Sequence, residues 1–272
     1  MGDLPASEKA GSQPSRFGPV EAGVHRTIGS DFTSLRFGET AFKHDSDPIS
    51  MLDHFVMTGP TFAPHLHQRI STVTALFEDS RGGLLNRDNI GASVDLQAGD
   101  LYRLAAGSGA VHEQNPSAGA RIHALQIFVK LPGAMHRGPP RTFHVRSADV
   151  PVDAGEGYRV RTVLGAHSHD GSSGGAEMTL LDCSLQPGGQ FTHGLPSARK
   201  AWVYVISGQL RIRSADGASM LEAGQMTTVG AGQAIDVSLH AAMTTHFILI
   251  DAEPLRSALA HSPATPSMKE AP

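Results

Sequence analysis

Residues 64–74 read PHLHQRISTVT, a stretch that joins two closely spaced histidines to the start of an apolar run. Side chains two residues apart on a β-strand point to the same face, so His65 and His67 would lie side by side while Leu66 points away. Two imidazoles in that arrangement suit one cation. An isolated H-x-H pair is weak evidence for a metal site, so the surrounding sequence has to decide its role.

The pattern on both sides of this stretch is that of strands. Runs such as STVTALFED, RIHALQIFVKL, AEMTLLDCSL and THFILIDA are short, rich in β-branched and aliphatic residues, and bounded by Gly, Asp, Asn or Pro. The chain's 30 glycines and 17 prolines also indicate many short elements joined by turns. A strand, turn, strand order recurs in the two halves, which indicates an all-β protein built from a doubled unit.

A length of 272 residues is enough for two ordinary domains. The segment LPGAMHRGPPRTFHV between the halves is rich in proline and glycine, which is typical of a linker. We therefore expect a disordered N-terminus at 1–20, an N-terminal domain with the metal site at 21–138, a C-terminal domain at 139–256 and a flexible tail at 257–272.

Composition excludes several classes of function. A formal net charge of -4 and the lack of a Lys or Arg run argue against direct nucleic-acid binding. We find no secretory h-region at the N-terminus and no apolar run near the roughly 20 residues that a membrane span needs. The single cysteine, Cys183, excludes an intramolecular disulfide and is compatible with a reducing compartment. We expect a cytoplasmic protein that binds neither nucleic acid nor membrane.

A third histidine follows about 45 residues later, in GDLYRLAAGSGAVHEQNP. A β-barrel can bring His112 opposite the first pair, which would complete three nitrogen ligands and leave coordination positions open for water or substrate. If this segment continues as a strand, Gln114 shares the face of His112 and Glu113 points to the other side.

These motifs together resemble the pirin family of bicupins. The resemblance covers roughly residues 25 to 255, is looser in the second half, and rests on the order of DPISMLDHF, PHLHQRISTVT, AGDLYRLAAGSGAVHEQNP, LQIFVKLP and PPRTF. It implies two cupin β-barrels facing each other and one mononuclear divalent metal, commonly iron, with nickel, copper, manganese or zinc as alternatives. The ligand positions that it implies are His65, His67 and His112, with Gln114 where the family has a glutamate.

The glutamine is a departure with physical consequences. Its carbonyl oxygen can bind a cation but supplies no negative charge, and it cannot accept a proton as a general base. Glu113 could replace the missing carboxylate only if a bulge turned it inward. Ser71 is a second departure, because it stands where the family often has an acidic residue.

Other histidines fit a metal site less well. His167 and His169 form a second H-x-H pair, but they lie in GAHSHDGSSGG, where no strand pattern fixes their geometry. His193 occupies a comparable place in the second half without a partner histidine, so we expect that barrel to be metal-free. Two readings are open for His54: it could lie near the mouth of the pocket, or be an ordinary, partly exposed histidine, which is the one we expect.

Three functions follow from the resemblance and the departures. The first is a metal-dependent dioxygenase, similar to quercetin 2,3-dioxygenases, that acts on a phenolic or flavonol-like small molecule. The second is a non-enzymatic, redox-sensing regulatory protein with a protein partner. The third is a degenerate bicupin without bound metal.

Overall fold

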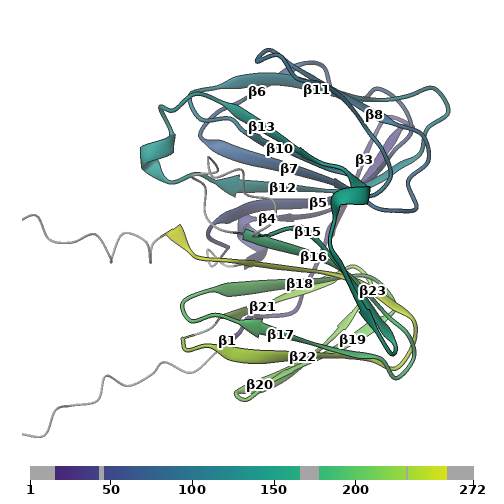
Figure 1. Ribbon diagram of the computed structural model, residues 1–272, viewed down its shortest axis with the longest axis vertical. Helices are drawn as coiled ribbons and strands as arrows, with labels where there is room; N and C mark the ends of the chain where they lie inside the picture. Colours follow the sequence, from purple (N-terminus) through teal and green to yellow (C-terminus); the bar gives the residue numbers. More distant parts are fainter. Residues whose placement is uncertain (1–15, 43–45, 166–177, 231, 256–272) are drawn as a thin grey trace, which may run out of the picture.

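The computed structural model describes residues 16–42, 46–165, 178–230 and 232–255. These residues form strands in four sheets, arranged as two β-barrels that lie one above the other in Figure 1. Besides strands, the named elements are three single-turn 3-10 helices, η1 (Glu39–Phe42), η2 (Gly133–Met135) and η3 (Ser147–Asp149). The expected all-β bicupin architecture is confirmed. The described part contains no helix long and apolar enough to cross a membrane.

The first barrel combines a seven-stranded sheet, in the order β13-β10-β7-β12-β5-β4-β3, with a four-stranded sheet, in the order β6-β11-β8-β9. The strands of the larger sheet are β3 (Val24–Ile28), β4 (Phe32–Gly38), β5 (Ile49–Met57), β7 (Ile70–Leu76), β10 (Leu101–Ala105), β12 (Ile122–Lys130) and β13 (Arg141–Val145). Those of the smaller sheet are β6 (His65–His67), β8 (Leu84–Asp88), β9 (Ser93–Leu96) and β11 (Ala110–Pro116).

The second barrel repeats this plan with an eight-stranded and a four-stranded sheet. The larger sheet contains β1 (Arg16–Phe17), β2 (Glu21–Ala22), β14 (Val152–Gly155), β15 (Tyr158–Leu164), β16 (Met178–Leu185), β18 (Lys200–Ser207), β21 (Gln225–Gly230) and β23 (Thr245–Ala252). The smaller sheet contains β17 (Gln190–Leu195), β19 (Gln209–Ser214), β20 (Gly217–Glu222) and β22 (Ile235–Ala241).

Both ends of the first barrel differ from the boundaries expected from the sequence. Strands β1 and β2 pair with β21, so residues 16–22 belong to the sheet of the second barrel, whereas the composition of residues 1–20 predicted no fixed structure. Backbone pairing can order a polar segment because it needs no apolar side chains. Strand β13 pairs with β10, so the first barrel extends beyond residue 138, past the proline-rich turn that looked like a linker.

The larger sheets of the two barrels face each other across a shared apolar layer. Phe37 and Leu52 of the first barrel pack there with Trp202, Tyr204 and Ile250 of the second. Separate apolar clusters fill the interior of each barrel. The central strands are therefore buried on both faces, which explains why KAWVYVIS lacks the polar alternation of a half-exposed strand.

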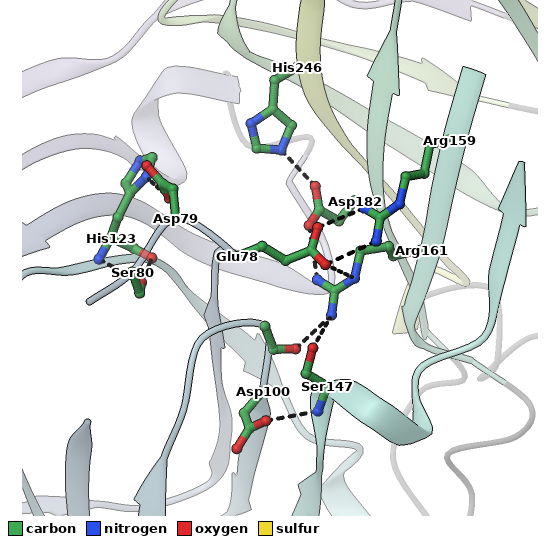
Figure 2. A network of polar contacts seen from close by, with 11 residues as sticks. Glu78, Asp79, Ser80, Asp100, His123, Ser147, Arg159, Arg161, Asp182 and His246 are labelled. Carbon is green, nitrogen blue, oxygen red and sulfur yellow. Dashed lines mark hydrogen bonds and ion pairs between the residues drawn. The ribbon is translucent and has the colours of Figure 1, made fainter. Parts of the chain in front are cut away.

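A network of polar contacts also joins the two barrels (Figure 2). The carboxylate of Glu78, which follows β7, accepts hydrogen bonds of 2.6 and 2.9 Å from Arg159 on β15. Arg161, almost fully buried, donates to the Gly99 carbonyl at 2.9 Å and to Asp182 at 3.2 Å. Burial favours the neutral form of Asp182, but contacts with His246 and Arg161 outweigh it and lower the pKa. Charge pairs thus join the barrels at the edge of the apolar layer.

His54 lies on the interface side of β5 rather than at the cavity mouth. The Tyr204 hydroxyl donates to His54 Nδ1 at 2.5 Å, and His54 Nε2 lies 2.6 Å from His123 Nε2. His123 in turn donates from Nδ1 to Asp79 at 2.7 Å, which leaves its Nε2 as the acceptor for His54. A directed chain of donors therefore runs from the second barrel to the surface of the first. Burial and the nearby His123 and His246 lower the pKa of His54 to about 3.

This chain predicts a pH dependence of stability. The pKa of His54 falls from 6.5 in the unfolded state to about 3 in the folded state. Below pH 6.5 the unfolded state therefore binds a proton at His54 and the folded state does not, which favours unfolding. The contribution of His54 is present above that pH and declines as the pH falls toward 3. We expect wild type to lose about 1 to 2 kcal/mol more than His54→Phe between pH 7 and pH 5, in urea denaturation. If wild type and His54→Phe lost the same free energy of unfolding between these pH values, His54 would not be held neutral in the folded state.

Candidate metal centre

Three histidines meet where β6 pairs with β11. His65 lies opposite His112 in this ladder, and His67 follows His65 on the same face. One ring nitrogen from each histidine lies within 4.8 Å of those from the other two. Leu66, between the pair, is 63% exposed and points away from the barrel. The spacing expected from the sequence is thus realised, and the ligand role of the three histidines stays a prediction.

Hydrogen bonds orient two of the imidazoles. His112 donates from Nδ1 to Asn86 on β8 at 3.1 Å, and His65 donates from Nδ1 to the Ala63 carbonyl at 3.0 Å. A donor at Nδ1 leaves the lone pair on Nε2, the usual arrangement for a metal-binding histidine. His67 Nε2 lies 3.0 Å from His112 Nε2. The three ring nitrogens lie close enough together to act as ligands of a single cation.

Burial keeps the imidazoles of His67 and His112 neutral at physiological pH. Burial and the neighbouring His65 lower the pKa of His67 to about 4. Burial and the neighbouring His67 and His65 lower the pKa of His112 to about 3. Only the neutral ring has a lone pair to offer, so His67 and His112 can bind a metal without first releasing a proton.

Gln114 faces the same cavity from β11, as the alternation along that strand predicted. Its amide nitrogen donates to Thr74 at 3.1 Å, and Thr74 donates to Gln126 Oε1 at 2.9 Å. This bond leaves the carbonyl oxygen of Gln114 as the atom that could bind a cation. Glu113 lies on the opposite face, 3.9 Å from Arg87, and β11 pairs with β8 in regular register. No bulge turns Glu113 inward, so it does not replace the missing carboxylate.

Ser71 is buried deep in the larger sheet, and it accepts a hydrogen bond of 2.9 Å from Arg103. It is therefore a partner of a buried arginine and does not line the cavity with the histidines.

The histidines form one wall of a cavity of about 130 Å³ inside the first barrel. The walls are largely apolar, with Phe32, Phe55 and Phe128 among them. A cavity of about 150 Å³ is known to hold one benzene ring, so this volume suits a single aromatic ring. The wall also includes Arg36 and Asp53, which form an ion pair. Sequence reasoning missed both, although Asp53 occupies an alternate position to His54 in DPISMLDHF and must therefore face the other way.

The remaining histidines that the sequence raised lie elsewhere. His193 lies 2.8 Å from Asp251, a carboxylate that Arg199 also contacts. These contacts occupy His193 in an ion-pair cluster of the second barrel. His167 and His169 lie outside the described residues. Within the described ranges, one group of three or more His, Cys, Asp or Glu side chains lies close enough together to share an ion, and it consists of His65, His67 and His112.

Comparisons with known proteins identify the family of the chain. Residues 24–129 match the family model "Pirin", and residues 180–262 match "Pirin C-terminal cupin domain". The chain belongs to the pirin family. It is 28% identical to human pirin over 221 residues, which is 80% of this chain and 76% of the human protein.

Solved structures show the same bicupin fold. A quercetin 2,3-dioxygenase from Acinetobacter baumannii superposes with a TM-score of 0.75 at 21% identity, over 89% of this chain and 88% of that one. The bacterial pirin YhhW from Escherichia coli, in complex with nickel(II), superposes with a TM-score of 0.67 at 22% identity, over 89% of this chain and 100% of that one. Pirin-family structures thus include one with a bound metal.

The ligand assignment predicts the metal content of the purified protein. We expect wild type to bind about one divalent metal per chain, and the double variant His65→Ala, His112→Ala to lose most of it, since a single nitrogen ligand holds a cation weakly. Elemental analysis after metal loading measures this content. The matched control is His25→Ala, His240→Ala, which removes two exposed histidines far from the cavity. Equal metal content in the two double variants would exclude the assignment.

Proposed function

We propose that the chain is a metal-dependent oxidoreductase of the dioxygenase type that acts on a phenolic or flavonol-like small molecule. The observation that carries the proposal is the convergence of three imidazole nitrogens on one wall of a largely apolar cavity. The related structures named for quercetin 2,3-dioxygenase and for a nickel(II) complex support it. Iron is the metal we expect first, with nickel, copper, manganese and zinc as alternatives.

In this proposal each part of the cavity has a separate task. His65, His67 and His112 hold the metal, and Gln114 offers a neutral oxygen. When bound, the metal supplies Lewis acidity toward a substrate oxygen. The phenylalanines of the wall exclude water and contact an aromatic ring. The single cysteine and ordinary charge balance fit our proposal that the protein works in the cytoplasm.

Oxygen consumption tests the reaction class. We expect iron(II)-loaded protein to consume dioxygen in the presence of at least one member of a panel of catechols, phenolic acids and flavonols, and the His65→Ala, His112→Ala variant to be inactive. An oxygen electrode measures the rate. A protein that binds one metal per chain yet is inert toward the whole panel would contradict catalysis and favour the regulatory alternative.

The neutral glutamine predicts weaker metal binding than a glutamate would give. We expect Gln114→Glu to bind divalent metal at least about tenfold more tightly, because a carboxylate adds a negative charge beside the cation. Competition with a chromophoric chelator measures the dissociation constant. Glu113→Gln serves as the matched control, since its side chain points away from the cavity. An unchanged constant for Gln114→Glu would show that position 114 does not bind the metal.

A further inference from the structure

An ion pair faces the histidines from the larger sheet of the first barrel. Arg36 on β4 and Asp53 on β5 lie directly opposite each other in the ladder, and both line the cavity. Arg36 donates to Asp53 Oδ2 from Nε at 2.9 Å and also from Nη2. The Asp53 side chain is 4% exposed and that of Arg36 is 31% exposed. The carboxylate is therefore buried behind a guanidinium that reaches the cavity.

This arrangement leaves hydrogen-bonding capacity unused. The guanidinium has five N–H donors, and within the described ranges its contacts come from Nε and Nη2, so Nη1 has no partner there. The second oxygen of Asp53, Oδ1, is buried and likewise lacks a hydrogen-bond partner among the described residues. Of these two atoms the Asp53 oxygen is the buried one, and an unpaired buried oxygen is costly and commonly marks a place where a ligand or a water supplies the missing donor, whereas Arg36 is partly exposed.

With a divalent cation bound, the cavity would carry a net positive charge, which favours an anionic ligand. Arg36 and Asp53 form an ion pair, so their charges cancel. Gln114 adds no charge where a glutamate would add one. A divalent cation would therefore keep its full charge, and a substrate with negative groups would neutralise it.

We propose that Arg36 determines substrate specificity by binding the carboxylate of a hydroxylated aromatic acid whose single ring occupies the cavity. Asp53 is a positioning residue, because it holds the guanidinium through Oδ2. The cavity volume of about 130 Å³ suits one ring, whereas further rings would extend through the mouth. The inference rests on the proposed function, since it names the substrate class of that same site.

A matched pair of ligands tests the inference. Catechol and 3,4-dihydroxybenzoate share the ring and both hydroxyls and differ in one carboxylate. We expect calorimetry on metal-loaded wild type to show binding of 3,4-dihydroxybenzoate about tenfold or more tighter than catechol, because the extra bond joins two charged groups. In Arg36→Gln the affinities for the two ligands should become equal.

Two further variants keep the test decisive. Arg36→Gln leaves Asp53 buried without its partner and is liable to misfold, so the double variant Arg36→Gln, Asp53→Asn removes both charges together. It should lose the same discrimination. Arg211→Gln, an exposed arginine of the second barrel, should keep it.

The outcomes separate this inference from the proposed function. Equal binding of the two ligands by wild type, or discrimination that survives in both Arg36 variants, overturns the role of Arg36 and leaves the metal site standing. Failure of metal-loaded wild type to bind either ligand contradicts the phenolic substrate class itself, and with it this inference.

Discussion

The apolar layer between the two larger sheets is the constraint on which the rest of the structure depends. It buries one face of every central strand in the first barrel, so the opposite face must line the barrel interior. On β5 this alternation sends Leu52 and His54 to the interface and Asp53 to the cavity. The second barrel thus sets the orientation of the cavity wall without contributing a residue to it.

A polar row crosses the cavity side of that same sheet. Arg36, Asp53, Gln126 and Thr74 occupy successive paired positions on β4, β5, β12 and β7. Thr74 bonds to both Gln126 and Gln114, so the row reaches the candidate metal centre from the sheet opposite the histidines. The histidines bring nitrogen donors from the smaller sheet and the row brings oxygen and guanidinium groups from the larger one. A ligand between them would meet both kinds of chemistry.

Much of this could be predicted from the sequence, and the reasons for the rest are physical. Strand alternation is a local rule, so the spacing of His65 and His67 predicted that they share a face. His112 lies 45 positions from His67, so its place beside them needed the further expectation of a barrel. The place of His54 could not be predicted, because it depends on a second barrel whose Tyr204 lies 150 positions away. The place of Arg36 in the cavity wall could not be predicted either, because no sequence motif marks it and it depends on the pairing of β4 with β5, which sets Arg36 opposite Asp53. Strands β1 and β13 lie outside the domains to which the expected limits assigned them. Backbone pairing determines which sheet each strand joins, and composition does not reveal that pairing.

The pairing of β1 and β2 with β21 also has a consequence for how the protein is made. Thr227 donates a hydrogen bond to the carbonyl of Gly18, 209 positions earlier in the sequence, so residues 16–22 are paired with a strand that is translated after the whole of the first barrel. The last strand of the first barrel ends at Val145, so this barrel can begin to fold before β1 and β2 have a partner strand. Strands β1 and β2 can join the sheet of the second barrel only after β21, at residues 225–230, has been translated, so the earliest strands of the described chain are among the last to find their partner.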